Sequence, residues 1–323
     1  MSFEPLPRAR FRLSRSVLYA IGHVPASIEA AAASDADVVL FELEDAVPVD
    51  LKQQARSNVV AALGDLDWTN KSGTVRVNAL DSPFTYLDVI ALLEAPSSAA
   101  IDSLFLPKAG TGADVYAFDT LVTQVERTNG RAEPLGFDIM IESTLGLSNV
   151  AAIASASPRI ESLQFGASDY ANSARMLTQV VGGPHPEYSI LDDDGKAQLS
   201  DPFHFPVSRL VAAARASGLR PIDGPYLDLA DLDTQTDGFM SSARRGRVLG
   251  CDGKQVMTSR QATLANDAFS PTGDEIERAR ELVDAAQQVG ADGVVVHQGK
   301  YIDQATLHAA NDTLAKADAI AQQ

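Results

Sequence analysis

Two carboxylates stand out in this sequence because each follows a short apolar run. Glu142 directly follows residues 137–141, and Asp169 comes shortly after residues 163–166, with a helix-length segment rich in Ala, Ser and Ile between the two runs. This is the pattern of a strand, a crossover helix and a second parallel strand. Because the C-terminal ends of parallel strands emerge on one side, we expect both carboxylates to reach one crevice.

The surroundings of the two carboxylates leave room for a cation and a ligand. They consist of small residues, namely Ser143, Thr144, Gly146, Gly166, Ala167 and Ser168. Mg²⁺ fits such a place because it takes oxygen ligands and keeps waters that a substrate can displace. The alternative is that both acids are helix N-caps or surface charges, and these two stretches alone leave it open.

Other charged residues are predicted at the same end of the strands. Glu44, Asp45, Lys108 and Asp223 lie at or just beyond predicted C-terminal strand ends, and Arg76 lies inside a predicted strand. An unpaired arginine among β-branched residues costs roughly several kcal/mol, so Arg76 needs a partner. It either forms a structural ion pair with Glu44 or Asp45, or faces a carboxylate or developing oxyanion near the metal. Lys108 is less informative, since a lysine at that place could simply be solvated.

The elements that must position these residues form a repeating pattern. Apolar segments alternate with helical ones and predict eight strands, at residues 16–20, 37–43, 74–78, 103–108, 137–141, 163–166, 222–225 and 254–258. We therefore predict an α/β fold, a (β/α)₈ TIM barrel with a C-terminal lid extension. An open doubly wound sheet is the alternative, but no Gly-rich phosphate-binding turn follows the first strand.

Two segments lie outside the regular pattern. A long irregular insertion at residues 178–205 is interpreted as a mobile rim around the crevice, because loops of that length are usually functional or disordered. A further strand and helix near the C-terminus have no place in a closed barrel, so they must pack outside it. We predict a catalytic barrel domain at residues 1–290 and a lid and oligomerisation extension at residues 291–323.

The composition narrows the class of partner. Forty-three acidic against twenty-six basic residues give a net charge of −17, which argues against nucleic acid or an anionic membrane as partner. The single cysteine, Cys251, excludes an internal disulfide, and we interpret it as a small buried residue in a reducing compartment. No apolar run reaches the ~20 residues of a membrane helix, and no signal-type stretch follows the N-terminal arginines. We predict a cytoplasmic protein.

The sequence resembles a known family at several stretches. It is similar to the citrate lyase beta-subunit-like branch of the HpcH/HpaI aldolase/citrate lyase family, and within it to the bacterial L-malyl-CoA/β-methylmalyl-CoA lyases. The resemblance covers residues 15–319. It rests on LEDAVPVD (43–50), VRVNALDSPFTYLDV (75–89), LPKAG (106–110), GFDIMIESTLGLSNVAAIA (136–154), FGASDYANS (165–173), GLRPIDGPYLDLADLD (218–233), NDAFSPT (266–272) and GKYID (299–303).

The resemblance implies roles for particular residues. Glu142 and Asp169 match the Mg²⁺ ligands of the family, with Mn²⁺ as a possible substitute. Arg76 matches the arginine that holds the enolate oxygen, and Asp303 matches an acid/base that a neighbouring subunit's lid supplies. Asp303 also directly precedes the predicted last helix, so an N-cap is its alternative role. Family members are similar in forming trimers or hexamers, so the resemblance implies a homotrimer or homohexamer.

The implied reaction is a reversible Claisen-type cleavage. A 3-hydroxyacyl-CoA, such as L-malyl-CoA, β-methylmalyl-CoA or a citramalyl-CoA type, yields glyoxylate or another 2-oxo acid plus acyl-CoA. CoA is thus part of the substrate rather than a bound cofactor. Glu44 and Asp45 match an acidic pair behind the metal site, and Arg76 and Asp303 would handle the developing charge and the proton.

Two loops depart from the family pattern. Residues 20–25 read AIGHVP and residues 255–261 read QVMTSRQ, and both lie at the rim where the thioester and CoA would rest. Three alternatives therefore stay open. They are a malyl-CoA thioesterase, an aldolase or lyase acting on a free acid without CoA, and a non-catalytic citrate lyase-like subunit.

Overall fold

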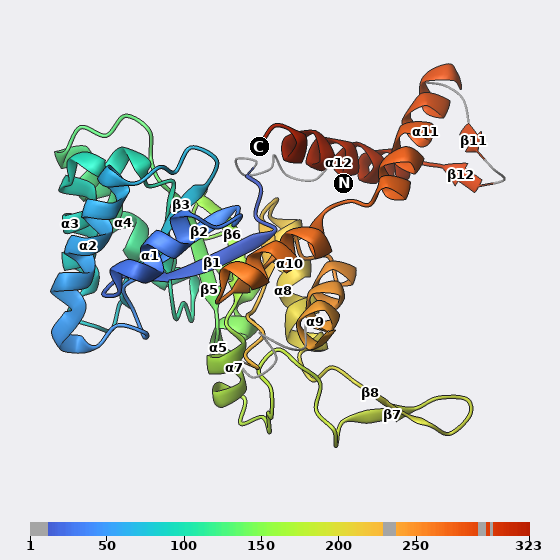
Figure 1. Cartoon of the computed structure of the whole chain (residues 1–323), viewed down its shortest axis with the longest axis horizontal. Helices are drawn as coiled ribbons and strands as arrows, with labels where there is room; N and C mark the ends of the chain where they lie inside the picture. The colour runs from blue at the N-terminus through green and yellow to red at the C-terminus, as the bar shows by residue number, and fades with distance from the viewer. Residues whose placement is uncertain (1–11, 229–236, 290–294, 298–299) are drawn as a thin grey trace. The chain divides into compact units, whose positions relative to one another are not determined.

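The chain folds into two compact units. The computed structural model describes residues 12–228, 237–289, 295–297 and 300–323 (Figure 1). The first unit covers Met1–Ala268 and the second Phe269–Gln323. The division falls before helix α11 (Gly273–Val289), whereas the sequence placed it at residue 290. Helix α11 packs against helix α12 (Gln304–Ala321) of the second unit. This packing explains why the boundary lies closer to the N-terminus than predicted.

The first unit is a closed barrel of parallel strands, as predicted. The strand order is β1-β10-β9-β6-β5-β4-β3-β2. The strands are β1 (Ser16–Ile21), β2 (Val38–Glu42), β3 (Ser72–Arg76), β4 (Ser103–Leu106), β5 (Gly136–Ile141), β6 (Ile160–Phe165), β9 (Arg220–Asp223) and β10 (Gly253–Val256). Strands β2, β5 and β6 are buried along their whole length, as expected for parallel strands covered on both faces.

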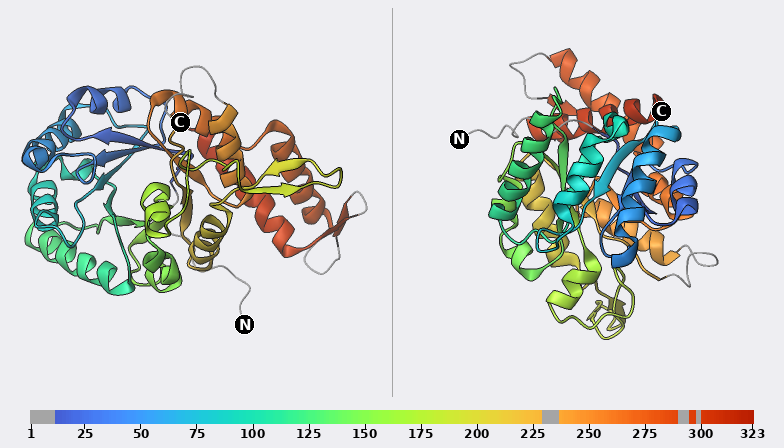
Figure 2. Two further views of the ribbon diagram at one scale, coloured as in Figure 1. Left: turned by 90° about the horizontal axis from the view of Figure 1, so that it is seen from below. Right: turned by 90° about the vertical axis from the view of Figure 1, so that its left-hand side faces the viewer.

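Helices surround the barrel strands, as the blue, cyan and green ribbons in the left view of Figure 2 show. The helical segments of this unit are α1 (Pro25–Ala32), η1 (Val49–Leu51), α2 (Lys52–Asp65), α3 (Thr85–Glu94), η2 (Pro96–Ala100), α4 (Gly112–Thr128), α5 (Thr144–Ser148), α6 (Val150–Ala154), α7 (Ala167–Ser173), α8 (His204–Ala216), α9 (Asp237–Val248) and α10 (Ser259–Phe269). A capping box of Thr111 and Asp114 begins α4, which satisfies amide groups that the first helical turn leaves unpaired.

Apolar side chains from several strands fill part of the barrel interior. The buried cluster consists of Val17, Val38, Leu40, Phe105, Met140 and Ile222, and Tyr19 packs against it. These residues come from five different strands, so the cluster forms only when the barrel closes. The cluster forms a common rigid centre for the strands. The charged residues lie beyond it, at the C-terminal ends of the strands.

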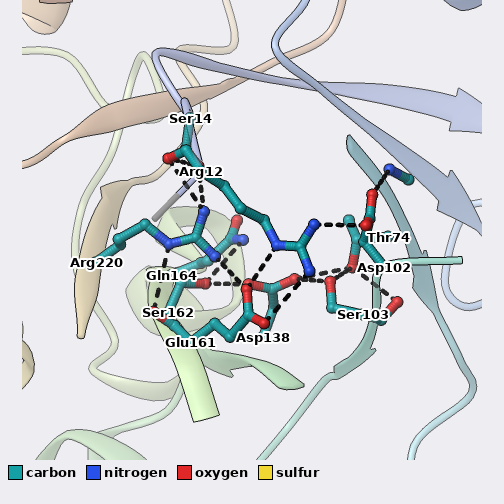
Figure 3. A network of polar contacts seen from close by, with 11 residues as sticks. Arg12, Ser14, Thr74, Asp102, Ser103, Asp138, Glu161, Ser162, Gln164 and Arg220 are labelled. Carbon is teal, nitrogen blue, oxygen red and sulfur yellow. Dashed lines mark hydrogen bonds and ion pairs between the residues drawn. The ribbon is translucent and has the colours of Figure 1, made fainter. Parts of the chain in front are cut away.

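An ionic network closes the N-terminal end of the barrel (Figure 3). Arg12, just before β1, lies 2.5 Å from Asp102 and 2.9 Å from Glu161. Arg220 also contacts Glu161, at 2.9 Å, and donates to Ser14 Oγ at 2.6 Å. These residues all stand at the beginnings of strands or just before them. The opposite, C-terminal end is therefore the end left for a site.

The insertion after α7 is more regular than the sequence indicated. It contains an antiparallel hairpin of β7 (Ser189–Leu191) and β8 (Ala197–Leu199), which extends away from the barrel in Figure 1. A second hairpin, β11 (Val295–His297) with β12 (Lys300–Ile302), precedes α12 in the second unit. In the described part of the chain, no helix is long and apolar enough to cross a membrane.

Candidate metal and active site

Glu142 lies directly after β5 and is 3% exposed. Its Oε1 accepts a hydrogen bond from the backbone amide of Lys108 at 2.6 Å. Lys108 has a left-handed backbone with φ of 56°, a conformation that is uncommon for a residue with a Cβ and that is usually held in place by its surroundings. No described residue donates a hydrogen bond to Oε2 of Glu142. One carboxylate oxygen is thus fixed by the protein, and the other is left for a ligand.

Asp169 lies in the first turn of α7 and is partly exposed. Its carboxylate forms no hydrogen bond or ion pair with any other described side chain, so it too has capacity for a ligand. Burial raises the pKa of Glu142 to about 8, and the charge of Asp169 contributes to the rise, although Arg76 opposes it. The two carboxylates therefore repel each other, and a cation between them would relieve this repulsion.

Gly166, the residue between β6 and α7, allows the Glu142 side chain to approach the backbone closely. A Cβ at this position would lie only 2.9 Å from Glu142 Oε2 and would also contact the Glu142 Cβ. A glycine is therefore required here for steric reasons, because any larger residue would displace the Glu142 side chain.

Arg76 is the last residue of β3 and is 6% exposed. The sequence pattern predicted Arg76 inside a strand at residues 74–78, whereas the strand ends at this residue. Its Nε donates to Glu42 Oε2, and its Nη1 lies 3.5 Å from Glu44 Oε2. Burial alone would lower the pKa of Arg76, but the charge of Glu42 more than offsets this and raises it. Arg76 thus stays positively charged next to the carboxylates.

Glu42 is the main partner of Arg76, and Glu44, one of the two partners that the structural alternative named, makes the longer contact. It is the last residue of β2, fully buried, and its Oε1 accepts from the Glu44 amide at 2.5 Å. The sequence contains a signal for such a contact, because a carboxylate at the end of an apolar strand, as Glu42 is, needs a cation. The pairing of Glu42 with Arg76 across β2 and β3 settles which cation it is.

Lys108 joins the acidic pair to the Glu142 carboxylate. Its Nζ lies 2.6 Å from Glu44 Oε1 and 2.8 Å from Asp45 Oδ1, so it is not simply a solvated lysine. Burial would lower the pKa of Lys108, but the hydrogen bonds to Asp45 and Glu44 raise it. Lys108, the second residue after β4, therefore connects the loop after β2 to the residue that follows β5.

Asp223 does not join this group, although it also ends a strand. Its carboxylate lies 2.7 Å from Lys254 Nζ and 2.9 Å from Arg245 Nη2, and Gly246 of α9 packs against it. It therefore faces the helix layer. There it forms a structural ion cluster with Arg245, which also binds Asp201 at the end of the insertion.

Asp303 belongs to the second unit, where it is the N-cap of α12. Its Oδ1 accepts from the Thr306 amide and from Thr306 Oγ1, both at 2.7 Å. These hydrogen bonds lower the pKa of Asp303. The capping role that the sequence allowed is thus present, and it keeps the carboxylate ionised.

Other candidates contribute less. Cys251 is a buried free thiol, as expected. Within the described ranges, no three His, Cys, Asp or Glu side chains are grouped so as to hold a metal ion. A cation at this site would therefore have two protein carboxylates and take its other ligands from water or substrate oxygens, an arrangement common for Mg²⁺.

The fold and the site together define the class of protein. They describe a (β/α)₈ barrel whose C-terminal strand ends bring together a carboxylate pair, a buried arginine and a lysine-bridged acidic loop, which is the face where this fold carries its chemistry. Residues 15–259 match the family model HpcH/HpaI aldolase/citrate lyase. The chain belongs to this family and is an enzyme of the lyase class.

Individual relatives agree with this placement. The chain is 41% identical to an L-malyl-CoA/β-methylmalyl-CoA lyase of Cereibacter sphaeroides over 99% of both chains. It is 32% identical to the citrate lyase subunit beta of Leuconostoc mesenteroides, over 91% of this chain and 89% of the relative. A solved citrate lyase structure from Burkholderia xenovorans matches the fold with a TM-score of 0.77 at 20% identity, covering 98% of this chain and 94% of that one.

Proposed function

We propose that this protein is a Mg²⁺-dependent carbon–carbon lyase that acts on a 3-hydroxyacyl-CoA such as L-malyl-CoA or β-methylmalyl-CoA. The products are glyoxylate or another 2-oxo acid and an acyl-CoA, and the reaction is reversible. The observation that carries the proposal is the open pair Glu142 and Asp169 beside the buried Arg76, in a chain 41% identical to a lyase of this name over nearly its whole length.

The metal is proposed to bind between Glu142 Oε2 and Asp169. Both have acceptor capacity that no described residue uses, and their mutual repulsion favours a cation, with Mn²⁺ as a possible replacement for Mg²⁺. A bound cation supplies Lewis acidity to the carboxylate and hydroxyl oxygens of what becomes the 2-oxo acid.

Arg76 is proposed to stabilise the thioester oxygen. When the bond between the hydroxyl-bearing carbon and the thioester α-carbon breaks, its electron pair moves onto the acyl-CoA part as an enolate. The Nε of Arg76 is held by Glu42, and no described residue accepts a hydrogen bond from Nη2. The Nη edge can therefore donate to the enolate oxygen from a position fixed beforehand.

Asp303 is proposed to deliver the proton to the enolate carbon, and to remove it in the condensation direction. It would do so at the barrel mouth of a neighbouring subunit in a homotrimer or homohexamer. Removal of the proton needs the carboxylate and its delivery needs the protonated carboxyl, and the hydrogen bonds to Thr306, which lower the pKa of Asp303, favour the carboxylate. We place the enzyme in the cytoplasm, in keeping with its one cysteine being a free thiol.

The test is a product assay with the purified chain. Acetyl-CoA or propionyl-CoA is mixed with glyoxylate or pyruvate, with Mg²⁺ or with EDTA, and products are identified by mass spectrometry. We expect a hydroxyacyl-CoA only with Mg²⁺, and its cleavage in the reverse assay. Release of free CoA from malyl-CoA without glyoxylate would mean a thioesterase, and no carbon–carbon bond formed from any pair would overturn the proposal.

A further inference from the structure

Tyr19 of β1 lies among the charged groups of the site, although nothing in the proposed function uses it. The guanidinium carbon of Arg76 lies 5.3 Å from the centre of the Tyr19 ring, within the range of a cation–π contact. Burial raises the pKa of the Tyr19 hydroxyl, and Arg76, Glu42 and Glu142 all act on it electrostatically. The ring is partly exposed, although its neighbours in the barrel cluster are fully buried.

The hydroxyl of Tyr19 begins a chain of hydrogen bonds through the barrel. It lies 3.2 Å from Gln255 Oε1, and Gln255 Nε2 donates to Gln164 Oε1 at 2.9 Å. Gln164 Nε2 then donates to Ser162 Oγ at 3.3 Å, and Ser162 donates to Asp138. The lower part of this chain, from Gln164 to Asp138, is visible in Figure 3.

Asp138 fixes the direction of the whole chain. As a buried carboxylate it only accepts, and it also receives hydrogen bonds from Thr74 at 2.9 Å and from Ser103 at 2.5 Å. The side-chain amides of Gln164 and Gln255 must therefore point their N–H groups toward Asp138 and their C=O groups toward Tyr19. Consequently the Tyr19 hydroxyl donates to Gln255, and its ring is held in one orientation.

We propose that Tyr19 is a positioning residue that fixes the guanidinium plane of Arg76. Glu42 holds the Nε end of the guanidinium, but the contact of Nη1 with Glu44 is long, at 3.5 Å. Without a surface beneath it, the Nη end could turn toward Glu44 and away from a substrate. The Tyr19 ring provides that surface, and Gln255 keeps the ring in place. This inference rests on the proposed role of Arg76 at the enolate oxygen.

The first test compares the rates of single variants. Tyr19→Leu removes the ring, and we expect kcat to fall about tenfold with KM for the acyl-CoA within twofold, because the contact acts through Arg76 and not on the bound ground state. Tyr19→Phe keeps the ring and should lose only about threefold. Tyr116→Leu, at a tyrosine on α4 that is 70% exposed, is the control and should match the wild type. Unfolding measurements establish that each variant is folded.

The second test asks whether Tyr19 acts through Arg76. Lysine lacks the planar group that the ring supports, so Tyr19→Leu should cost less than threefold in an Arg76→Lys background. Tyr19→Phe and Gln255→Met both remove the hydrogen bond between these two residues, and Gln255→Met also removes the one to Gln164. The double variant should therefore lose no more than Gln255→Met alone.

The outcomes separate this inference from the proposed function. An undiminished tenfold loss in the Arg76→Lys background would overturn the positioning role and leave the lyase proposal intact. So would a Tyr19→Leu variant that changes KM and not kcat, since that result assigns Tyr19 to substrate binding. A full rate in Arg76→Lys itself would remove the roles of both residues, while the wild-type product assay would still decide the lyase activity.

Discussion

At the scale of single residues, the site depends on carboxylate oxygens that the protein leaves available. The backbone amide of Lys108 donates to Oε1 of Glu142, and the absence of a side chain at Gly166 leaves room for Oε2. The affinity for the metal should therefore fall when one methyl group is added at residue 166, although this residue carries no charge and is not a proposed metal ligand.

Gly166→Ala should weaken Mn²⁺ binding at least about tenfold, because the new Cβ displaces the Glu142 side chain, and such overpacking typically costs about 1–3 kcal/mol. Titration of the protein with Mn²⁺, followed by the electron paramagnetic resonance of the free ion, measures this directly. Glu142→Ala gives the reference for complete loss. Gly64→Ala in α2, where an added Cβ meets only ordinary contact at 3.5 Å, is the matched control. Unchanged affinity in Gly166→Ala would show that Glu142 Oε2 is not a ligand.

Arg76→Lys should lower kcat on the order of 10²-fold or more, comparable to the removal of one oxyanion donor. Lysine retains the positive charge beside Glu42 but loses the planar fork whose Nη edge faces the site. Steady-state kinetics of cleavage provide the measurement, with unfolding curves as the check on stability. A rate within threefold of the wild type would reduce Arg76 to a structural partner of Glu42.

At the scale of elements, a buried ion cluster joins β9 and β10 to α9 and to the end of the insertion. Asp223 is 1% exposed and contacts both Lys254 and Arg245. Burial alone would raise the pKa of Asp223, but the two cations lower it below its ordinary value of 3.8. This cluster belongs to the stability of the fold rather than to the chemistry.

Asp223→Asn should reduce the free energy of unfolding by about 3–5 kcal/mol at pH 7, because two buried cations lose their counter-charge. Since the folded-state pKa of Asp223 is depressed, its contribution is fully present above the unfolded value of 3.8. The contribution is lost as the pH falls through the folded value, so the difference between wild type and variant should shrink below that pH. Denaturant unfolding at a series of pH values measures it.

The control for this prediction is Asp252→Asn. Asp252 pairs with Arg215 at a more exposed place, where a pair contributes about 0–1 kcal/mol. If Asp223→Asn cost no more than this control, or if its cost did not change in acid, the cluster would not stabilise the fold as described.

At the scale of the whole molecule, the two units raise the question of how Asp303 reaches a site. The barrel carries the candidate metal ligands, and Asp303 lies in the other unit as the cap of α12. We propose that Asp303 donates and accepts the proton at the barrel mouth of a neighbouring subunit.

Mixing two inactive variants, Asp303→Ala and Glu142→Ala, tests this sharing. After subunit exchange, some mouths should combine an intact metal site with an intact Asp303, and part of the lyase activity should return. Exchange is verified by mass spectrometry of differently labelled subunits, and each variant mixed with itself is the control. Verified exchange without recovered activity would mean that Asp303 acts within its own chain or only caps the helix.

The sequence by itself determined the barrel and the end at which its charges meet. Strand and helix periodicity, and the position of a residue after an apolar run, are local properties, so the eight strands and the places of Glu142 and Asp169 at their ends were predictable. The resemblance to the family added an expected role for Arg76, and the family itself is confirmed. The role of each site residue remains a prediction that the experiments above address.

Only the tertiary structure decided which side chains pair. Glu42 and not Glu44 became the main partner of Arg76, and Asp223 turned toward α9. Tyr19 reached Arg76 and Gln255 because closure of the barrel places β1 next to β10 and close to β3. These contacts join residues far apart in the chain, and their choice depends on strand register and on the inward or outward direction of each side chain. Neither property is encoded in a local pattern, since both follow from how the whole sheet closes.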